Sequence, residues 1–129
     1  MWIMTMHDFL ETDYARMRIE DSILVFQYKP TKIRGIELAR RIVSDRLKFQ
    51  KGRAYPVLCD ARRLLDADNI ARNFLAYEGT LLTKAISFLV QPIHNKARAE
   101  FFVQSNTPLV PTAIFINEEQ ARSFLRSYI

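Results

Sequence analysis

Near the start of the chain, apolar and polar positions alternate with the period of a β-strand that has one solvent-exposed face. In residues 15–19, apolar side chains alternate with two arginines. Polar residues 20–22 then turn the chain, and residues 23–29 are rich in β-branched and aromatic side chains. This pattern predicts a β-hairpin, which ends at Pro30 because proline lacks the backbone N–H that a strand ladder needs.

The rest of the chain alternates between amphipathic segments of helical period and short, continuously apolar segments. The helical period predicts helices over about residues 32–49, 70–77, 92–104 and 118–128. The apolar runs predict strands buried on both faces over residues 54–59, 85–90 and 112–116. The order of elements is therefore ββαβαβαβα.

Helix ends can be predicted from capping residues. Asp66 or Asp68 is available as the N-cap of the second helix, which ends near Gly79 or continues to Leu82. Pro92 suits the first turn of the third helix, with Ile93 turned inward. For the last helix, Asn117 and Gln120 resemble a capping box, followed by an apolar stripe of Ala121, Phe124, Leu125 and Tyr128.

Strands that alternate with helices imply parallel crossovers, and the opening hairpin adds an antiparallel strand. We therefore expect an α/β fold with a mixed sheet of about five strands and about four helices. The chain has 129 residues and no repeat or Gly/Ser linker, which indicates one domain over residues 1–129 with an N-terminal arm at 1–13.

Composition narrows the class of protein. The net charge of +5 is spread among acidic residues without a basic cluster, so we expect no nucleic-acid partner. No stretch approaches the roughly 18 to 20 apolar residues of a membrane span, and the N-terminus lacks the features of a secretion signal. Cys59, the single cysteine, lies in a predicted buried strand. These features predict a cytoplasmic protein with a buried thiol.

Residues 57–71 read VLCDARRLLDADNIA and lead from a buried strand into the second helix. With the order of elements, this stretch resembles the STAS domain, the fold of bacterial anti-sigma-factor antagonists, and the related SpoIIAA-like group. The segment from YKP to YPVLCDAR and the ending from FF to the last tyrosine are similar to small uncharacterised STAS-like proteins of Bacteroidetes. The resemblance covers about residues 15–129.

The resemblance implies a non-enzymatic regulatory or protein-interaction module. In the antagonists, a partner kinase phosphorylates a serine in the turn after this strand. The corresponding position here is Asp68, which has no hydroxyl group. We therefore expect the binding surface of the family without its phosphorylation switch.

Charged and amide side chains crowd the turn after this strand, at the carboxyl end of a predicted parallel strand, where open α/β sheets commonly bind ligands. The candidate partner-binding or ligand-binding residues are Asp60, Arg62, Arg63, Asp66, Asp68, Asn69 and Arg72. Helix capping and surface ion pairs explain the same pattern without a function. The sequence leaves both interpretations open.

The sequence contains no pattern that identifies a reaction. His7 and His94 have no cysteine or histidine at zinc-binding spacing, and no glycine-rich phosphate loop is present. We expect no metal and no cofactor. An enzyme that uses Asp60, Arg62 and Asp66 is one alternative, and it requires these groups to converge in one cleft.

Apolar side chains suggest two further alternatives. Phe101 and Phe102 are adjacent in a predicted helix, so both cannot point straight into the core. Trp2 and Met4 lie in an apolar arm that needs a surface to cover it. These four residues pack on their own domain, or bury an interface of a homodimer, or line a pocket. A carrier of a small apolar or amphipathic ligand would need a pocket of at least about 300 Å³ near Phe101 and Phe102.

Overall fold

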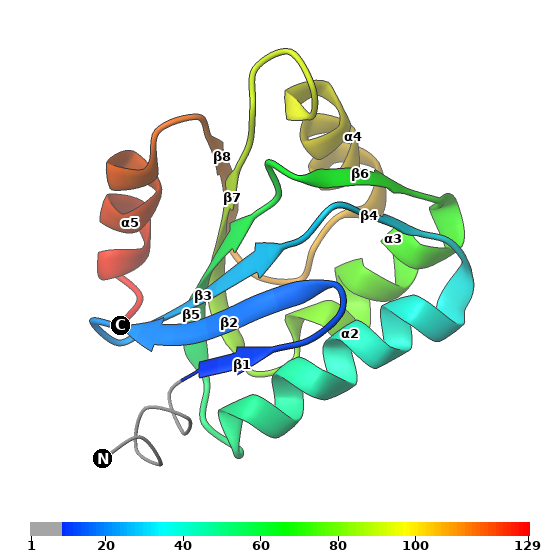
Figure 1. Cartoon of the computed structure of the whole chain (residues 1–129). Helices are drawn as coiled ribbons and strands as arrows, with labels where there is room; N and C mark the ends of the chain where they lie inside the picture. Colours follow the sequence, from blue (N-terminus) through cyan, green and yellow to red (C-terminus); the bar gives the residue numbers. More distant parts are fainter. Residues whose placement is uncertain (1–8) are drawn as a thin grey trace.

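A computed structural model describes residues 9–129 of the chain, and its centre is a six-stranded mixed sheet (Figure 1). The strands are β1 (Phe9–Glu11), β2 (Ala15–Glu20), β3 (Ile23–Tyr28), β5 (Tyr55–Asp60), β7 (Thr83–Leu89) and β8 (Thr112–Phe115). Their order across the sheet is the same as their order along the chain. β1, β2 and β3 pair antiparallel, whereas β3, β5, β7 and β8 pair parallel.

The predicted hairpin is confirmed as β2 and β3. Asp21 and Ser22 form its two-residue turn with positive φ angles of 51° and 66°, which suit the right-handed twist of paired strands. The sheet has six strands rather than the expected five because Phe9–Glu11, assigned to the arm from the sequence, pairs with β2. That pairing depends on β2 being in place, so the local pattern of three residues does not reveal it.

Helices cover both faces of the sheet, which confirms the predicted α/β architecture (Figure 1). The α-helices formed by residues 9–129 are α2 (Gly35–Gln50), α3 (Asn69–Tyr77), α4 (Lys96–Asn106) and α5 (Glu118–Arg126). Along β3, Leu24 and Phe26 face the cluster that includes α2 and α3, whereas Ile23 and Val25 face α5. Burial on both faces is why the central strands read as continuous apolar runs.

A second, two-stranded sheet consists of β4 (Thr31–Ile33) and β6 (Leu64–Ala67), which pair in parallel. The predicted helix start at residue 32 is therefore wrong, and the stretch from Asp60 to Arg72 contains a strand as well as a turn. β4 follows β3, and β6 follows β5. Because β3 and β5 are parallel neighbours, the segments that leave their carboxyl ends run side by side and pair.

Two other predicted helix boundaries also move. The third helix begins at Lys96 rather than Pro92, and Ile93 is 90% exposed instead of turned inward. The second helix ends at Tyr77 and passes into a 3₁₀ turn, η1 (Glu78–Thr80). The predicted N-cap of the last helix is confirmed, because the Asn117 side chain accepts the backbone N–H of Gln120 at 3.0 Å.

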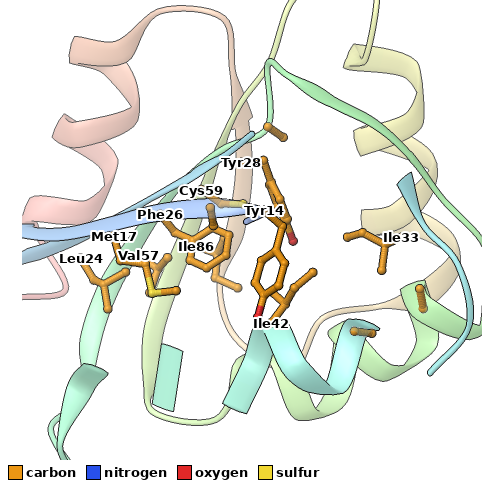
Figure 2. Packing of buried hydrophobic residues seen from close by; sticks show 14 of the residues in the cluster. Tyr14, Met17, Leu24, Phe26, Tyr28, Ile33, Ile42, Val57, Cys59 and Ile86 are labelled. Carbon is orange, nitrogen blue, oxygen red and sulfur yellow. The ribbon is translucent and has the colours of Figure 1, made fainter. Parts of the chain in front are cut away.

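The larger apolar core lies between the sheet and helix α2. Phe26, Cys59 and Ile86 face this side of the sheet, opposite Ile42 of α2 (Figure 2). Ile33 of β4 belongs to the same buried cluster (Figure 2). The β4/β6 pair thus adds a further apolar wall near the carboxyl edge of the main sheet.

Candidate functional site

The stretch from Asp60 to Arg72 starts at the carboxyl end of β5 and ends in the first turn of α3. Asp60 is buried, and the Nε and Nη2 groups of Arg62 donate to its two oxygens at 2.9 and 2.7 Å. The Arg62 backbone N–H and the Gln27 amide donate to the same carboxylate. Burial alone raises the pKa of Asp60, but these donors outweigh it and hold the pKa below its usual value.

Asp68 joins the starts of two helices. One carboxylate oxygen accepts the Ala71 backbone N–H at 2.9 Å, which caps α3, and the other accepts the Gly35 backbone N–H at 2.8 Å. The bonds from Ala71 and then Gly35 lower the pKa of Asp68. Asp68 is therefore the N-cap of α3, and it also ties α3 to the start of α2.

Asp66 lies on β6, apart from Asp60 and Arg62. Its carboxylate is 4.0 Å from Arg34 and 3.9 Å from Arg98, distances too long for hydrogen bonds. Within the described part of the chain, no ion pair or hydrogen bond connects Asp66 to the Asp60–Arg62 pair. The three groups proposed for an enzyme thus do not form one bonded cluster.

Arg72 packs between β6 and α4. Its guanidinium donates to the Ala67 carbonyl and to Asn69 at 3.4 Å, and it lies 5.2 Å from the centre of the Phe101 ring. The Arg72 Nε is buried and has no hydrogen-bond partner within residues 9–129. Arg63 is exposed on the loop before β6. Arg72 therefore takes part in the packing between α3 and α4, whereas Arg63 does not.

A cavity of about 310 Å³ lies between the main sheet, α2, α3, α4 and β6. Most of its wall is apolar and includes Phe26, Ile42, Val57, Leu75, Ile86, Phe88, Phe101 and Phe102. Four alanines also face it, and their short side chains leave the space unfilled: Ala61, Ala67, Ala97 and Ala99. Asp66 and Arg98, each about half exposed, lie on its solvent side.

The side chains of Phe101 and Phe102 point in different directions, as those of neighbouring residues in a helix must. Phe102 packs edge-to-face on Phe88 with ring centres 5.6 Å apart, whereas Phe101 is 53% exposed beneath Arg72. Both residues line the cavity, as the carrier hypothesis required. The other apolar candidates, Trp2 and Met4, lie outside the described residues.

A buried arginine also lines the cavity. Arg46 of α2 is 5% exposed and donates to the Gln50 side chain and to the carbonyls of Gly79 and Leu81, at 3.1 and 3.0 Å. All of these acceptors are neutral. Burial lowers the pKa of Arg46 to about 10, so the group remains a cation at neutral pH.

Tyr28 and Cys59 line the cavity near Arg46. Among residues 9–129, no hydrogen bond involves the Tyr28 hydroxyl. Burial raises the pKa of Tyr28 and of Cys59, so both groups are neutral at physiological pH. The described part of the cavity wall thus combines an apolar surface with one buried cation and one unpartnered hydroxyl group.

Sequence reasoning missed Arg46 and Tyr28. One signal was available for Arg46, because it follows Ile42 and Val43 at helical spacing on the apolar face of α2. A cation at such a position is unusual enough to mark it for attention. No comparable signal exists for Tyr28, since an aromatic residue at a strand end is ordinary.

A sequence profile described as "Domain of unknown function (DUF7793)" matches residues 17–129. The chain belongs to the DUF7793 family. No curated protein matches the DUF7793 chain. A similar solved structure is that of an uncharacterized protein from the DUF3478 family with a SpoIIAA-like fold, from Shewanella loihica PV-4. The two are 13% identical, with a TM-score of 0.62 over 90% of the DUF7793 chain and 98% of the other.

At this identity, the likeness shows the fold alone, and it confirms that the DUF7793 chain has the SpoIIAA-like fold that the resemblance implied. Within residues 9–129, no three His, Cys, Asp or Glu side chains are grouped so as to hold a metal ion. None of the helices in that range has the length and apolarity needed to cross a lipid bilayer.

Proposed function

We propose that this protein is a non-enzymatic binding module that holds a small apolar or amphipathic ligand in the cavity between the sheet and the helices. The observation that carries the proposal is the apolar cavity of about 310 Å³. Ligand pockets usually measure about 300 to 1,000 Å³ and have mostly apolar walls. With a liquid volume of about 30 Å³ per water molecule, the cavity has room for roughly ten non-hydrogen atoms.

The position of the cavity supports the same proposal. Ala61 and Val90, which directly follow β5 and β7, line it, so the cavity reaches the carboxyl ends of parallel strands where ligands of α/β folds commonly bind. The polar groups of the nearby turn are engaged in the fold, because Arg62 neutralises Asp60 and two backbone N–H groups bind Asp68. This arrangement favours binding over catalysis.

A binding assay with 1-octanol tests the proposal, because this neutral amphiphile matches the size of the cavity. At about 0.5 kcal/mol for each of its non-hydrogen atoms, 1-octanol should bind with a Kd of about 0.5 mM by calorimetry. Ala99→Phe fills the cavity from α4 and should weaken binding at least tenfold, whereas Gln104→Phe, on an exposed position of the same helix, should not. If 1-octanol, octanoate and octylamine all fail to bind saturably, the proposed function is wrong.

A regulatory or protein-interaction role is the second candidate, and an exposed apolar surface favours it. Leu65, Ile70 and Phe101, on β6, α3 and α4, are 48%, 58% and 53% exposed. Two of them lie within the Asp60 to Arg72 stretch that resembles the antagonists' binding turn. We propose that this surface self-associates as a homodimer, and that the protein is cytoplasmic, which the buried free thiol of Cys59 supports.

Sedimentation velocity tests the second candidate. The wild type should increase in mass with concentration, whereas Ile70→Glu should remain a monomer. Ile116→Glu is a matched control, because Ile116 is also 58% exposed but lies between β8 and α5. A wild type that remains monomeric up to about 0.5 mM would rule out this self-association. A specific homodimer is expected to have a dissociation constant below about 1 mM and would be partly formed at that concentration.

A further inference from the structure

The inner wall of the cavity carries a positive charge that no carboxylate within residues 9–129 neutralises. Arg46 is 5% exposed, and its three hydrogen bonds go to an amide oxygen and two backbone carbonyls. A guanidinium group has five N–H donors, so two remain. A buried cation without a counter-charge is costly, and an anionic group placed beside it recovers part of that cost.

The Tyr28 hydroxyl supplies a second donor. Tyr28 is 6% exposed and lines the same cavity from the end of β3, and its hydroxyl has no hydrogen-bond partner among the described residues. Among the described residues, the fully buried side-chain atoms without a partner are the Arg72 Nε and the Asn106 Oδ1, so the Tyr28 oxygen remains accessible to a small molecule in the cavity. A free hydroxyl group in a cavity wall, close to a buried cation, therefore marks a place for an acceptor that the ligand brings.

The arginines on the solvent side differ from Arg46. Arg98 is about half exposed, donates to the carbonyls of Leu65 and His94, and lies near the Asp66 carboxylate. Water and a nearby acid therefore already stabilise its charge, so an anion gains less there. The buried Nε of Arg72 has no partner in the described part of the chain, so an anion bound near Arg72 and Arg98 is the competing arrangement.

We propose that the ligand is a medium-chain carboxylate bound with its head group inward, where it accepts hydrogen bonds from the Arg46 guanidinium and the Tyr28 hydroxyl. Its apolar chain then lies against Phe88 and Phe102 toward α4. The volume of about 310 Å³ limits the chain to roughly eight carbons, at about 30 Å³ for each non-hydrogen atom. This inference rests on the proposed ligand-binding function and specifies its chemistry.

Three probes with the same eight-carbon chain separate charge from apolar contact: octanoate, 1-octanol and octylamine. By calorimetry on the wild type, octanoate should bind at least tenfold more tightly than 1-octanol, and octylamine should bind most weakly. Tyr28→Phe removes only a hydroxyl that has no partner in the protein, so it should fold normally and weaken octanoate binding about tenfold. Arg46→Met should weaken octanoate binding at least tenfold without weakening 1-octanol binding.

Arg98→Met tests the competing arrangement, because Arg98 lines the same cavity from its solvent side. Arg41→Met, at an exposed position of α2 outside the cavity wall, is the matched control, and octanoate affinity should not change in it. Equal affinity of the wild type for octanoate and 1-octanol would overturn the inference and leave the binding function standing. Loss of octanoate binding in Arg98→Met or Arg72→Met, with full binding in Tyr28→Phe, would also overturn it. If Arg46→Met fails to fold, the octanoate affinity of Tyr28→Phe tests the inference by itself.

Discussion

Replacing Asp60 by alanine tests whether the acidic stretch after β5 serves the fold or a partner. The substitution removes two hydrogen bonds from the Arg62 side chain, one from its backbone N–H and one from Gln27. It leaves the Arg62 guanidinium without its only ion-pair partner in residues 9–129. We expect Asp60→Ala to destabilise the protein.

The magnitude follows from the exposure of the two side chains. Exposed ion pairs contribute about 0 to 1 kcal/mol, and loss of one partner from a buried pair costs about 3 to 5 kcal/mol. The Asp60 side chain is 7% exposed, but that of Arg62 is 41% exposed and reaches water once its partner is gone. The free energy of unfolding should therefore fall by about 2 kcal/mol.

Urea unfolding monitored by circular dichroism measures this loss as a lower midpoint with an unchanged m-value. A double-mutant cycle with Arg62→Ala should give a coupling energy of about 1 kcal/mol, because the two side chains share two hydrogen bonds. A loss below about 0.5 kcal/mol, with no coupling, would refute the structural role and return Asp60 to the list of binding residues.

The same pair predicts a pH dependence. The pKa of Asp60 is lower in the folded chain than in the unfolded chain, where it is about 3.9. The carboxylate therefore contributes stability above that unfolded value, and the contribution is lost as the pH falls through the lower, folded pKa. The stability difference between wild type and Asp60→Asn should shrink between about pH 5 and pH 2. A constant difference over this interval would contradict the assignment.

Three further predictions use the same unfolding or labelling measurements. Asp68→Ala should lower the urea midpoint clearly more than Asp66→Ala, because Asp68 binds two backbone N–H groups and Asp66 has only long contacts; equal midpoints would contradict its capping role. Asn117→Ala should cost about 1 kcal/mol by uncapping α5, and a change within error would show that the cap is dispensable. Cys59 should react with iodoacetamide at pH 8 far more slowly in the folded protein than in urea, because burial raises its pKa and leaves little thiolate; equal rates would refute this.

Most of the main sheet and its helices could be predicted from local patterns. The hairpin, the buried strands and the capped last helix each depend on residues a few positions apart, whose period reports the side that faces the core. The misplaced boundaries share a different cause. Thr31–Ile33 and Leu64–Ala67 are strands because they pair with each other across more than one intervening element, and no local pattern encodes that pairing.

The candidate site was predicted in part. The sequence marked Phe101 and Phe102 as candidates for a pocket or an interface, and both line the cavity. It offered Asp66 or Asp68 as the cap of the second helix, and the cap is Asp68. It also grouped Asp60 with Asp66, which the fold places in separate contacts. Positions along the chain do not show which side chains face one another across a strand, so a cluster in sequence became two clusters in space.

The order and type of the main elements, their buried faces and the missing hydroxyl at position 68 are readable from residue types, because each depends on chemistry within one segment. The cavity, in contrast, cannot be predicted from the residue types of any one segment. It exists because α2, α3, α4, β6 and the sheet enclose a volume that four alanines leave unfilled. Arg46 and Tyr28 come from separate elements, and folding alone turns a helix arginine and a strand-end tyrosine into neighbours in one cavity wall. Close packing and burial are properties of the assembled chain, and they are what give these two side chains a shared role.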